Sequence, residues 1–154
     1  MQRISVVRVS AMKNKILFPN ENIITTKLFT INQDWEVPIP GFFIIAPLRK
    51  IKSISDFSDE EAIEFINIIR KIREGMRDIL KIDEVYFFQN EDSEYEFHLW
   101  IFPRHEWMEK FGRKIQSVRP IINHAKENMI NKDVFQEVKE YVKKMKKYMS
   151  DFYQ

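Results

Sequence analysis

Residues 95–103 read YEFHLWIFP, a run that alternates apolar side chains with other types at the two-residue period of a β-strand. The apolar side chains of one face are expected to enter the core: Phe97, Leu99 and Ile101. The other face carries mixed chemistry: Glu96, His98, Trp100 and Phe102. His98 therefore has a carboxylate and an indole two residues away on either side. By periodicity alone, this histidine is either a packing residue or a functional one.

Further strands are predicted on the N-terminal side of this run. VYFF at 85–88 reads as a strand, and the polar segment QNEDSE at 89–94 would join it to residues 95–103 as an antiparallel hairpin. Earlier in the chain, IITTKLFTI at 23–31 is rich in β-branched and aromatic residues and is predicted to form a strand. FFIIAP at 42–47 is apolar enough for a buried strand, and we expect it to pair with residues 23–31 across a short loop.

A long amphipathic helix is predicted between these strand pairs, from about residue 59 to 81. Ser58 and Glu61 form a capping-box pattern at its start. Apolar residues follow at helical spacing: Ala62, Phe65, Ile66, Ile69, Ile72, Met76, Ile79 and Leu80. The tail after Pro120 is also predicted to be helical, and its many lysines are interpreted as a solvated helix face.

The composition is that of a globular protein, and it narrows the chemistry. The chain has 154 residues and a formal net charge of +2, which indicates no specific nucleic acid and no membrane as partner. It has no cysteine, so disulfides and thiolate chemistry are excluded. No apolar leader or bilayer-length run is present, and a soluble, cytoplasmic protein is expected. The spacing of the three histidines is not a strong ligand motif, and we expect no metal and no cofactor.

The segment EFHLWIFPR at 96–104 resembles the signature of the histidine-triad family. In that signature three histidines alternate with hydrophobic residues, and two hydrophobic positions and often Pro-Arg follow. Aligning Pro103-Arg104 with that ending places the three triad positions at Glu96, His98 and Trp100. Upstream, PIPGFFIIAPLRKIKSISDFSDEE at 38–61 and NENIITTKLFTINQD at 20–34 resemble further parts of the family core. The resemblance covers roughly residues 20 to 105.

The resemblance implies an α+β fold with the architecture of that family. We expect an antiparallel sheet of about five strands, a long helix packed on it and additional C-terminal helices. A single domain over residues 1–154 is expected, with its core at about 20–105 and a helical extension at about 115–150. Family members are usually dimeric, so a homodimer is expected.

The resemblance also implies a reaction. In the family the middle histidine is the nucleophile, a role that falls on His98 here. A nucleotide phosphohydrolase or nucleotidyltransferase is therefore expected, acting on a nucleoside phosphate or dinucleoside polyphosphate through a nucleotidyl-histidine. An imidazole suits this chemistry because it is neutral and nucleophilic near pH 7. Its other ring nitrogen should be held by an acceptor, which in the family is a backbone carbonyl near the first triad position.

Two departures from the family pattern bear on catalysis. Glu96 replaces a histidine beside the nucleophile, and its charge could raise the pKa of the imidazole or repel a phosphate. Trp100 replaces the third histidine, which in hydrolase members donates a hydrogen bond near the leaving oxygen. An indole N–H can donate one hydrogen bond but cannot transfer a proton. Losing such a donor can cost on the order of 10²-fold in rate.

Other positions are assigned to nucleotide or phosphate binding with an ordinary structural alternative beside each. Asp34 matches the acid that holds ribose hydroxyls in the family, and it is otherwise a loop acid. Asn90 and Ser93 match phosphate contacts, or they are simple turn residues. Arg104 could bind phosphate bidentately, or it is a solvated or paired charge. His105 either extends the site or lies in a surface loop.

Three functions remain open from the sequence. The first is an enzyme that works through His98. The second is a catalytically impaired nucleotide-binding or protein-interaction module, favoured by the two lost histidines and the acidic EDSEY at 91–95. In the third, His98 is only structural. A cleft that is open over His98 favours the enzyme, whereas a cleft plugged by Trp100 favours the other two.

Overall fold

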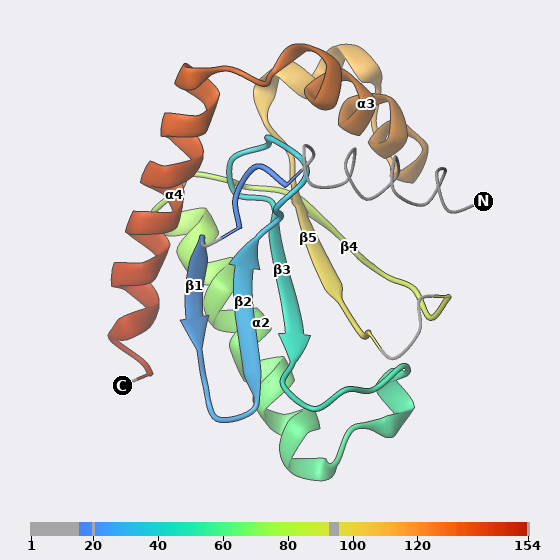
Figure 1. The fold of residues 1–154 in the computed structure, drawn as a ribbon, viewed down its shortest axis with the longest axis vertical. Helices are drawn as coiled ribbons and strands as arrows, with labels where there is room; N and C mark the ends of the chain where they lie inside the picture. Colours follow the sequence, from blue (N-terminus) through green and yellow to red (C-terminus); the bar gives the residue numbers. More distant parts are fainter. Residues whose placement is uncertain (1–15, 20, 93–95, 154) are drawn as a thin grey trace, which may run out of the picture.

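The protein is described from a computed structural model that covers residues 16–19, 21–92 and 96–153. Its centre is a five-stranded sheet in the order β1-β2-β3-β5-β4, and every neighbouring pair is antiparallel (Figure 1). The strands are β1 (Asn22–Thr25), β2 (Phe29–Gln33), β3 (Phe43–Pro47), β4 (Val85–Gln89) and β5 (Leu99–Pro103). The predicted α+β class and the number of strands are confirmed.

The segment 23–31 forms a hairpin, so the prediction of a strand along its whole length is wrong. β1 and β2 are joined by a tight turn in which the Thr26 N–H donates to the Phe29 carbonyl at 2.7 Å. The Thr26 hydroxyl also accepts from the N–H groups of Leu28 and Phe29. A threonine hydroxyl can satisfy turn amides in this way, although no Gly, Pro or Asn marks the turn in the sequence. The predicted pairing with the next strand is confirmed, with Ile31 opposite Ile45.

The strand predicted at 95–103 is shorter than expected, because β5 begins only at Leu99. Just before it, the Phe97 N–H donates to the Ile51 carbonyl at 2.9 Å, outside the sheet ladder. The predicted alternation nevertheless continues through this stretch. Phe97, Leu99 and Ile101 are buried in the main hydrophobic cluster, whereas Phe102 is buried in a second cluster.

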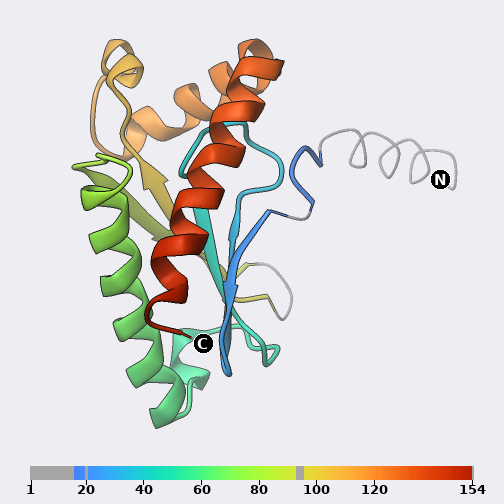
Figure 2. The same ribbon diagram turned by 90° about the vertical axis from the view of Figure 1, so that its left-hand side faces the viewer.

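Two long helices cover one face of the sheet (Figure 2). They are α2 (Asp59–Asp78) and α4 (Lys132–Ser150), and α4 contacts both α2 and β1. The predicted capping box is confirmed, since the Ser58 hydroxyl accepts from the Glu61 N–H and the Glu61 carboxylate accepts from the Ser58 N–H. α2 ends three residues before the predicted position 81, where Lys81 has a φ of 59° that a helix cannot continue through.

One end of the opposite face is covered by the segment that follows β5. This segment contains the short helices η2 (Glu106–Phe111) and η3 (Ile115–Ser117) and the helix α3 (Val118–Asn128). α3 buries Val118, Ile121 and Ala125 in the second cluster, together with Phe42 and Phe102 of the sheet. The remaining helix is η1 (Ile54–Asp56), before α2. None of the helices in the described ranges has the length and apolar character needed to cross a membrane.

Candidate nucleotide-binding site

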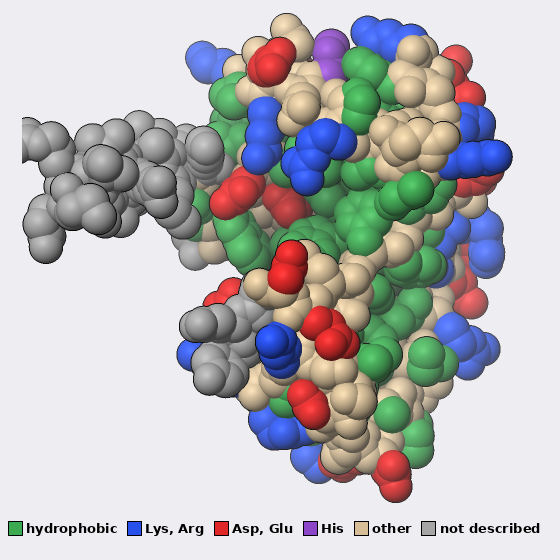
Figure 3. Space-filling view, turned by 90° about the vertical axis from the view of Figure 1, so that its right-hand side faces the viewer, with side chains coloured by type: hydrophobic (Ala, Val, Ile, Leu, Met, Phe, Trp, Pro, Cys, Tyr) green, Lys and Arg blue, Asp and Glu red, His purple; other side chains and the backbone are tan. Residues whose placement is uncertain are grey.

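A cleft of about 460 Å³ opens on the sheet face that carries His98, beside α3. It is lined by side chains from the loop after β2, from the sheet and from α3: Asp34, Trp35, Glu36, Val37, Phe42, Ile44, Phe88, Gln89, Asn90, Glu96, His98, Trp100, Arg119, Ile122 and Lys126. Both basic and acidic side chains border an apolar hollow on this side of the molecule (Figure 3). The structure thus brings together five of the residues predicted for the site: Asp34, Asn90, Glu96, His98 and Trp100.

His98 is half-buried in this cleft between two indoles. Its ring lies 6.0 Å from the ring of Trp35 and 5.5 Å from that of Trp100, each edge to face. Burial lowers the pKa of His98 below its ordinary 6.5, and the negative charge of Glu96 offsets part of this effect. The imidazole is therefore mainly neutral at pH 7, the state in which a ring nitrogen can attack phosphorus. Among residues 16–19, 21–92 and 96–153, neither ring nitrogen has a hydrogen-bond partner.

Asp34 and Trp100 line the same cleft. Asp34 Oδ1 accepts the N–H groups of Glu36 and Val37, each at 2.9 Å. Burial raises the pKa of Asp34 above its ordinary value, and these two hydrogen bonds act against that rise, with a smaller effect from the Trp100 side chain. The only donor on the Trp100 side chain is its indole N–H, which can donate a hydrogen bond but cannot transfer a proton.

Glu96 and Asn90 lie at the exposed edge of the same cleft. The charge of Glu96 raises the pKa of His98, which is one of the two effects considered for it from the sequence. Asn90 follows β4, and its backbone carbonyl accepts a hydrogen bond from the Gln89 side chain. Ser93, the third phosphate position assigned by resemblance, lies outside the described residues.

The sequence did not single out the cations of this cleft. Arg119 and Lys126 line it together with Ile122, all from α3. Spacings of three and four residues place these side chains on one face of the helix. This spacing can be read from the sequence. The sequence does not indicate that this helix face lines the cleft that contains His98. Trp35, from the loop after β2, also lines the cleft.

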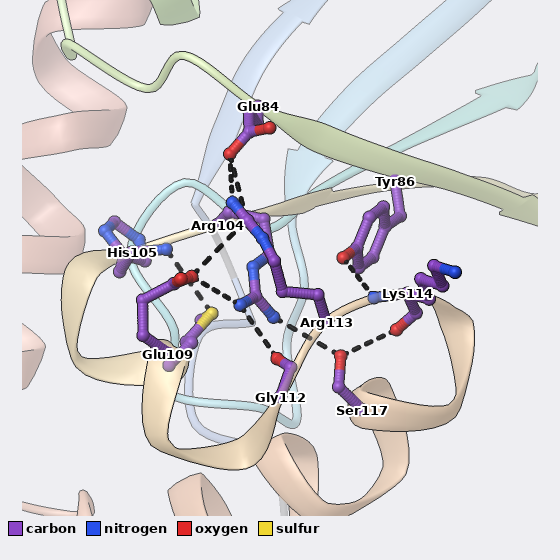
Figure 4. Close-up of polar contacts among 10 residues, drawn as sticks. Glu84, Tyr86, Arg104, His105, Glu109, Gly112, Arg113, Lys114 and Ser117 are labelled. Atoms are coloured by element: carbon purple, nitrogen blue, oxygen red, sulfur yellow. Dashed lines mark hydrogen bonds and ion pairs between the residues drawn. The ribbon is translucent and has the colours of Figure 1, made fainter.

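Arg104 is not among the residues that line the cleft. Its side chain is buried and holds the segment after β5 in place (Figure 4). Its guanidinium donates to Glu109 Oε2 at 2.7 Å, to the Gly112 carbonyl at 3.0 Å and to the Ser117 hydroxyl at 3.3 Å. This position gives no support to the predicted phosphate contact, and the paired-charge alternative describes the contacts that are present.

The other two histidines also lie away from the cleft. His105 lies half-buried in the loop between β5 and η2, and its Nε2 lies 2.6 Å from the Pro40 carbonyl, outside the residues that line the cleft. His124 is half-buried, with its ring 5.5 Å from Trp107 and 5.2 Å from Phe111. No group of three His, Cys, Asp or Glu side chains able to hold a metal ion occurs in the part of the chain that the structure describes.

No protein-family model matches the sequence, and no curated protein matches it. Solved structures do match in fold. A zinc-bound histidine-triad family protein from Mycobacterium smegmatis is 14% identical with a TM-score of 0.59, over 86% of each chain. Diadenosine triphosphate hydrolase from Plasmodium falciparum, in complex with cyclomarin A, is 18% identical with a TM-score of 0.59, over 88% of this chain and 80% of that one.

A third similar structure is a Hit-like protein involved in cell-cycle regulation from Bartonella henselae, with an unknown ligand. It is 18% identical with a TM-score of 0.58, over 92% of this chain and 95% of that one. These similarities agree with the five-stranded antiparallel sheet, the long helix and the C-terminal helices of this chain. The chain has the histidine-triad fold.

Proposed function

We propose that the chain binds a nucleoside phosphate in the His98 cleft and transfers or hydrolyses its nucleotidyl group. The observation that carries this proposal is a neutral, half-buried imidazole facing an open cleft of about 460 Å³. Trp100 lines this cleft together with His98 and leaves it open. The similar Plasmodium falciparum structure, a diadenosine triphosphate hydrolase, supports the same chemical class.

The proposed reaction has two steps. A ring nitrogen of His98 attacks the α-phosphorus, the bond from phosphorus to the leaving oxygen breaks, and its electron pair departs with that oxygen. Water, or another acceptor hydroxyl, then attacks the phosphorus of the nucleotidyl-histidine, the phosphorus–nitrogen bond breaks with its electron pair returning to the imidazole, and the attacking oxygen gives up a proton to solvent. The first step needs the unprotonated imidazole, which burial favours at pH 7.

The rest of the cleft suits the nucleoside. Phe42, Ile44 and Phe88 provide an apolar wall for a base. Asp34 Oδ1 accepts two hydrogen bonds in the structure, and a carboxylate has about four acceptor positions, which leaves positions for ribose hydroxyls. Asn90 lies at the cleft edge where it could donate to a phosphate oxygen.

A second candidate function is nucleotide binding without turnover. It is favoured by the tryptophan at the third triad position, because the indole N–H of Trp100 cannot transfer a proton to a leaving group. The loss of a donor at the third triad position affects substrates whose leaving group must gain a proton most strongly.

Turnover separates the two candidates. The chain would be incubated with adenosine and guanosine phosphoramidates, dinucleoside polyphosphates and nucleotide sugars, and the released nucleotide measured for wild type, His98→Ala and the control His124→Gln. His124 packs on Trp107 and Phe111 outside the cleft, so its variant should retain activity. Release that depends on His98 supports the enzyme, binding without release supports the module, and no binding of any nucleotide rejects both.

A single domain over residues 1–154 and a homodimer also remain proposals. Packing of α4 into the main cluster and of α3 into the second supports one domain. β4 is an edge strand of the sheet, and Phe87 on it is 47% exposed, which supports β4 as a contact between two copies. Light scattering after gel filtration, on wild type and Phe87→Lys, tests the dimer.

A further inference from the structure

The helix α3 forms the side of the cleft that carries positive charge. It is fixed there by Val118, Ile121 and Ala125, which are buried in the second hydrophobic cluster. The neighbouring helix face presents Arg119, Ile122 and Lys126 to the cleft. Because the buried face anchors the helix, the two cations start from a fixed backbone, and binding requires ordering only of their side chains.

The charges that line the cleft divide by element. The acids come from the loop after β2 and from the residues before β5: Asp34, Glu36 and Glu96. The lysines and arginines among the described lining residues come from α3 alone: Arg119 and Lys126. Without α3, the described lining would present these three carboxylates and no cation to a phosphate chain. Coulomb repulsion disfavours that arrangement.

Neither α3 cation is engaged elsewhere in the described part of the chain. Arg119 and Lys126 have no hydrogen bond and no ion pair there, whereas Arg49, Arg104 and Arg113 each hold a carboxylate. Arg119 is exposed and Lys126 is half-buried. Two unpaired cations on one wall of a cleft are available to bind an anion.

We propose that Arg119 and Lys126 bind the phosphate chain of the ligand beyond its α-phosphate. This inference rests on the proposed function, which places the α-phosphate at His98. Seven residues of α-helix separate the two backbone positions by about 10.5 Å, so the two side chains suit successive phosphates better than one. The site therefore selects a nucleoside di- or triphosphate, or a dinucleoside polyphosphate, over a nucleoside monophosphate ester.

Arg119 and Lys126 could also compensate in part for the histidine that is absent from the third triad position. A phosphate leaving group has a second pKa near 6, so it can depart as an anion at pH 7 without receiving a proton. Positive charge near the departing oxygen then lowers the barrier by stabilising that anion. The amine of a phosphoramidate has to be protonated, and no described residue at the third triad position can supply the proton.

Calorimetric titration tests this inference with paired ligands. Adenosine and guanosine monophosphates and triphosphates would be titrated into wild type, into Arg119→Gln/Lys126→Gln, and into the control Lys143→Gln/Lys146→Gln. The control removes the same charge from exposed positions of α4. The α3 variant should lose about tenfold or more in affinity for the triphosphates, and much less for the monophosphates. The control variant should match wild type, and melting curves should show that all three proteins fold.

Equal losses for mono- and triphosphates, or no loss, would overturn the inference while leaving the His98 proposal in place. If wild type binds no nucleotide, the proposed function fails. Titration with inorganic tripolyphosphate then tests the phosphate-chain site on its own. Tripolyphosphate binding that disappears in the α3 variant and not in the α4 control still supports the phosphate-chain site. Tripolyphosphate that binds both variants equally, or does not bind wild type, overturns it.

Discussion

The Trp100 ring lies 5.5 Å from the His98 ring, edge to face, so the residue at the third triad position packs against the proposed nucleophile. The Trp35 ring lies 6.0 Å from His98 on a similar edge-to-face contact, and all three side chains line one cleft. Asp34, which is 66 positions before Trp100, lines the same cleft. In this chain the third triad position therefore packs on the imidazole of the second.

Trp100→Phe should weaken ligand binding and stability together. The substitution keeps an aromatic ring but removes the indole N–H and part of the edge-to-face contact with His98, which should cost about 1 kcal/mol of unfolding free energy at pH 7. The pKa of Asp34 should rise further. Chemical denaturation and nucleotide titration measure the two effects. Trp107→Phe is the matched control because Trp107 packs on Phe111 and His124 outside the cleft, and an equal loss in both variants would contradict the role of Trp100.

The pKa of His98 should set the acid limb of any activity. Burial places this pKa below 6.5, so the rate through His98 should rise with pH and level off before pH 7. Glu96→Gln removes the charge that raises this pKa, so the midpoint of the limb should move to still lower pH. NMR titration of the His98 ring protons follows the same group without substrate. A midpoint above 6.5, or no shift with Glu96→Gln, would contradict the electrostatics described above.

Burial of His98 should also make acid destabilising. The folded state binds the His98 proton less tightly than the unfolded state, so the unfolded state holds more protons as the pH falls through 6.5. Unfolding free energy should therefore decrease from pH 7 to pH 5, and His98→Gln should reduce this slope. Urea denaturation at several pH values gives the slope, and an unchanged slope in the variant would assign the effect to other groups.

The ion pair of Glu61 with Arg49 should stabilise the protein above pH 4.5. Arg49 Nη2 lies 2.7 Å from Glu61 Oε1, and this hydrogen bond is the main reason that the pKa of Glu61 falls to about 2. A lowered folded pKa adds stability above the ordinary value of 4.5, and that stability is lost as the pH falls toward 2. Arg49→Met should lower the melting temperature at pH 7 and flatten the loss between pH 4.5 and 2. A variant with the wild-type acid profile would show that the pair contributes nothing measurable.

Arg104→Met should reduce stability without changing the affinity of the folded protein for nucleotides. It removes the donor to Glu109, Gly112 and Ser117, and the segment after β5 loses its main polar anchor. The loss should be about 2 kcal/mol or more of unfolding free energy. Affinity measured well below the melting temperature should match that of wild type. A selective loss of affinity for phosphate-bearing ligands would contradict this prediction and would indicate that Arg104 contributes to ligand binding.

The sequence predicted the features that depend on local pattern. The alternation around His98 assigned Phe97 and Leu99 to the core, and the capping box located the start of α2. The resemblance to the histidine-triad signature assigned both Asp34 and Trp100 to one candidate site, and both line the same cleft. These predictions succeed because one side-chain period or one short motif determines them.

Features that depend on distant partners were not predictable in the same way. His105 meets the Pro40 carbonyl 65 residues away, and Arg104 is buried by a segment that folds back after β5. The turn of the hairpin within 23–31 is stabilised by the hydroxyl of Thr26, which accepts from turn amides. Threonine is also common within strands, so this residue does not mark a turn in the sequence. The cations of α3 line the cleft only because the neighbouring face of that helix packs in the second cluster with Phe42 and Phe102.

The central claim is that His98 carries the nucleotidyl group, and a trapped adduct tests it most directly. Wild type, His98→Ala and His124→Gln would be mixed with adenosine and guanosine triphosphates and diadenosine triphosphate, denatured at once at alkaline pH, and mapped by mass spectrometry. A nucleoside monophosphate on His98 in wild type and in His124→Gln, and absent from His98→Ala, is the predicted result. Turnover with no adduct on His98, and undiminished in His98→Ala, would contradict the account.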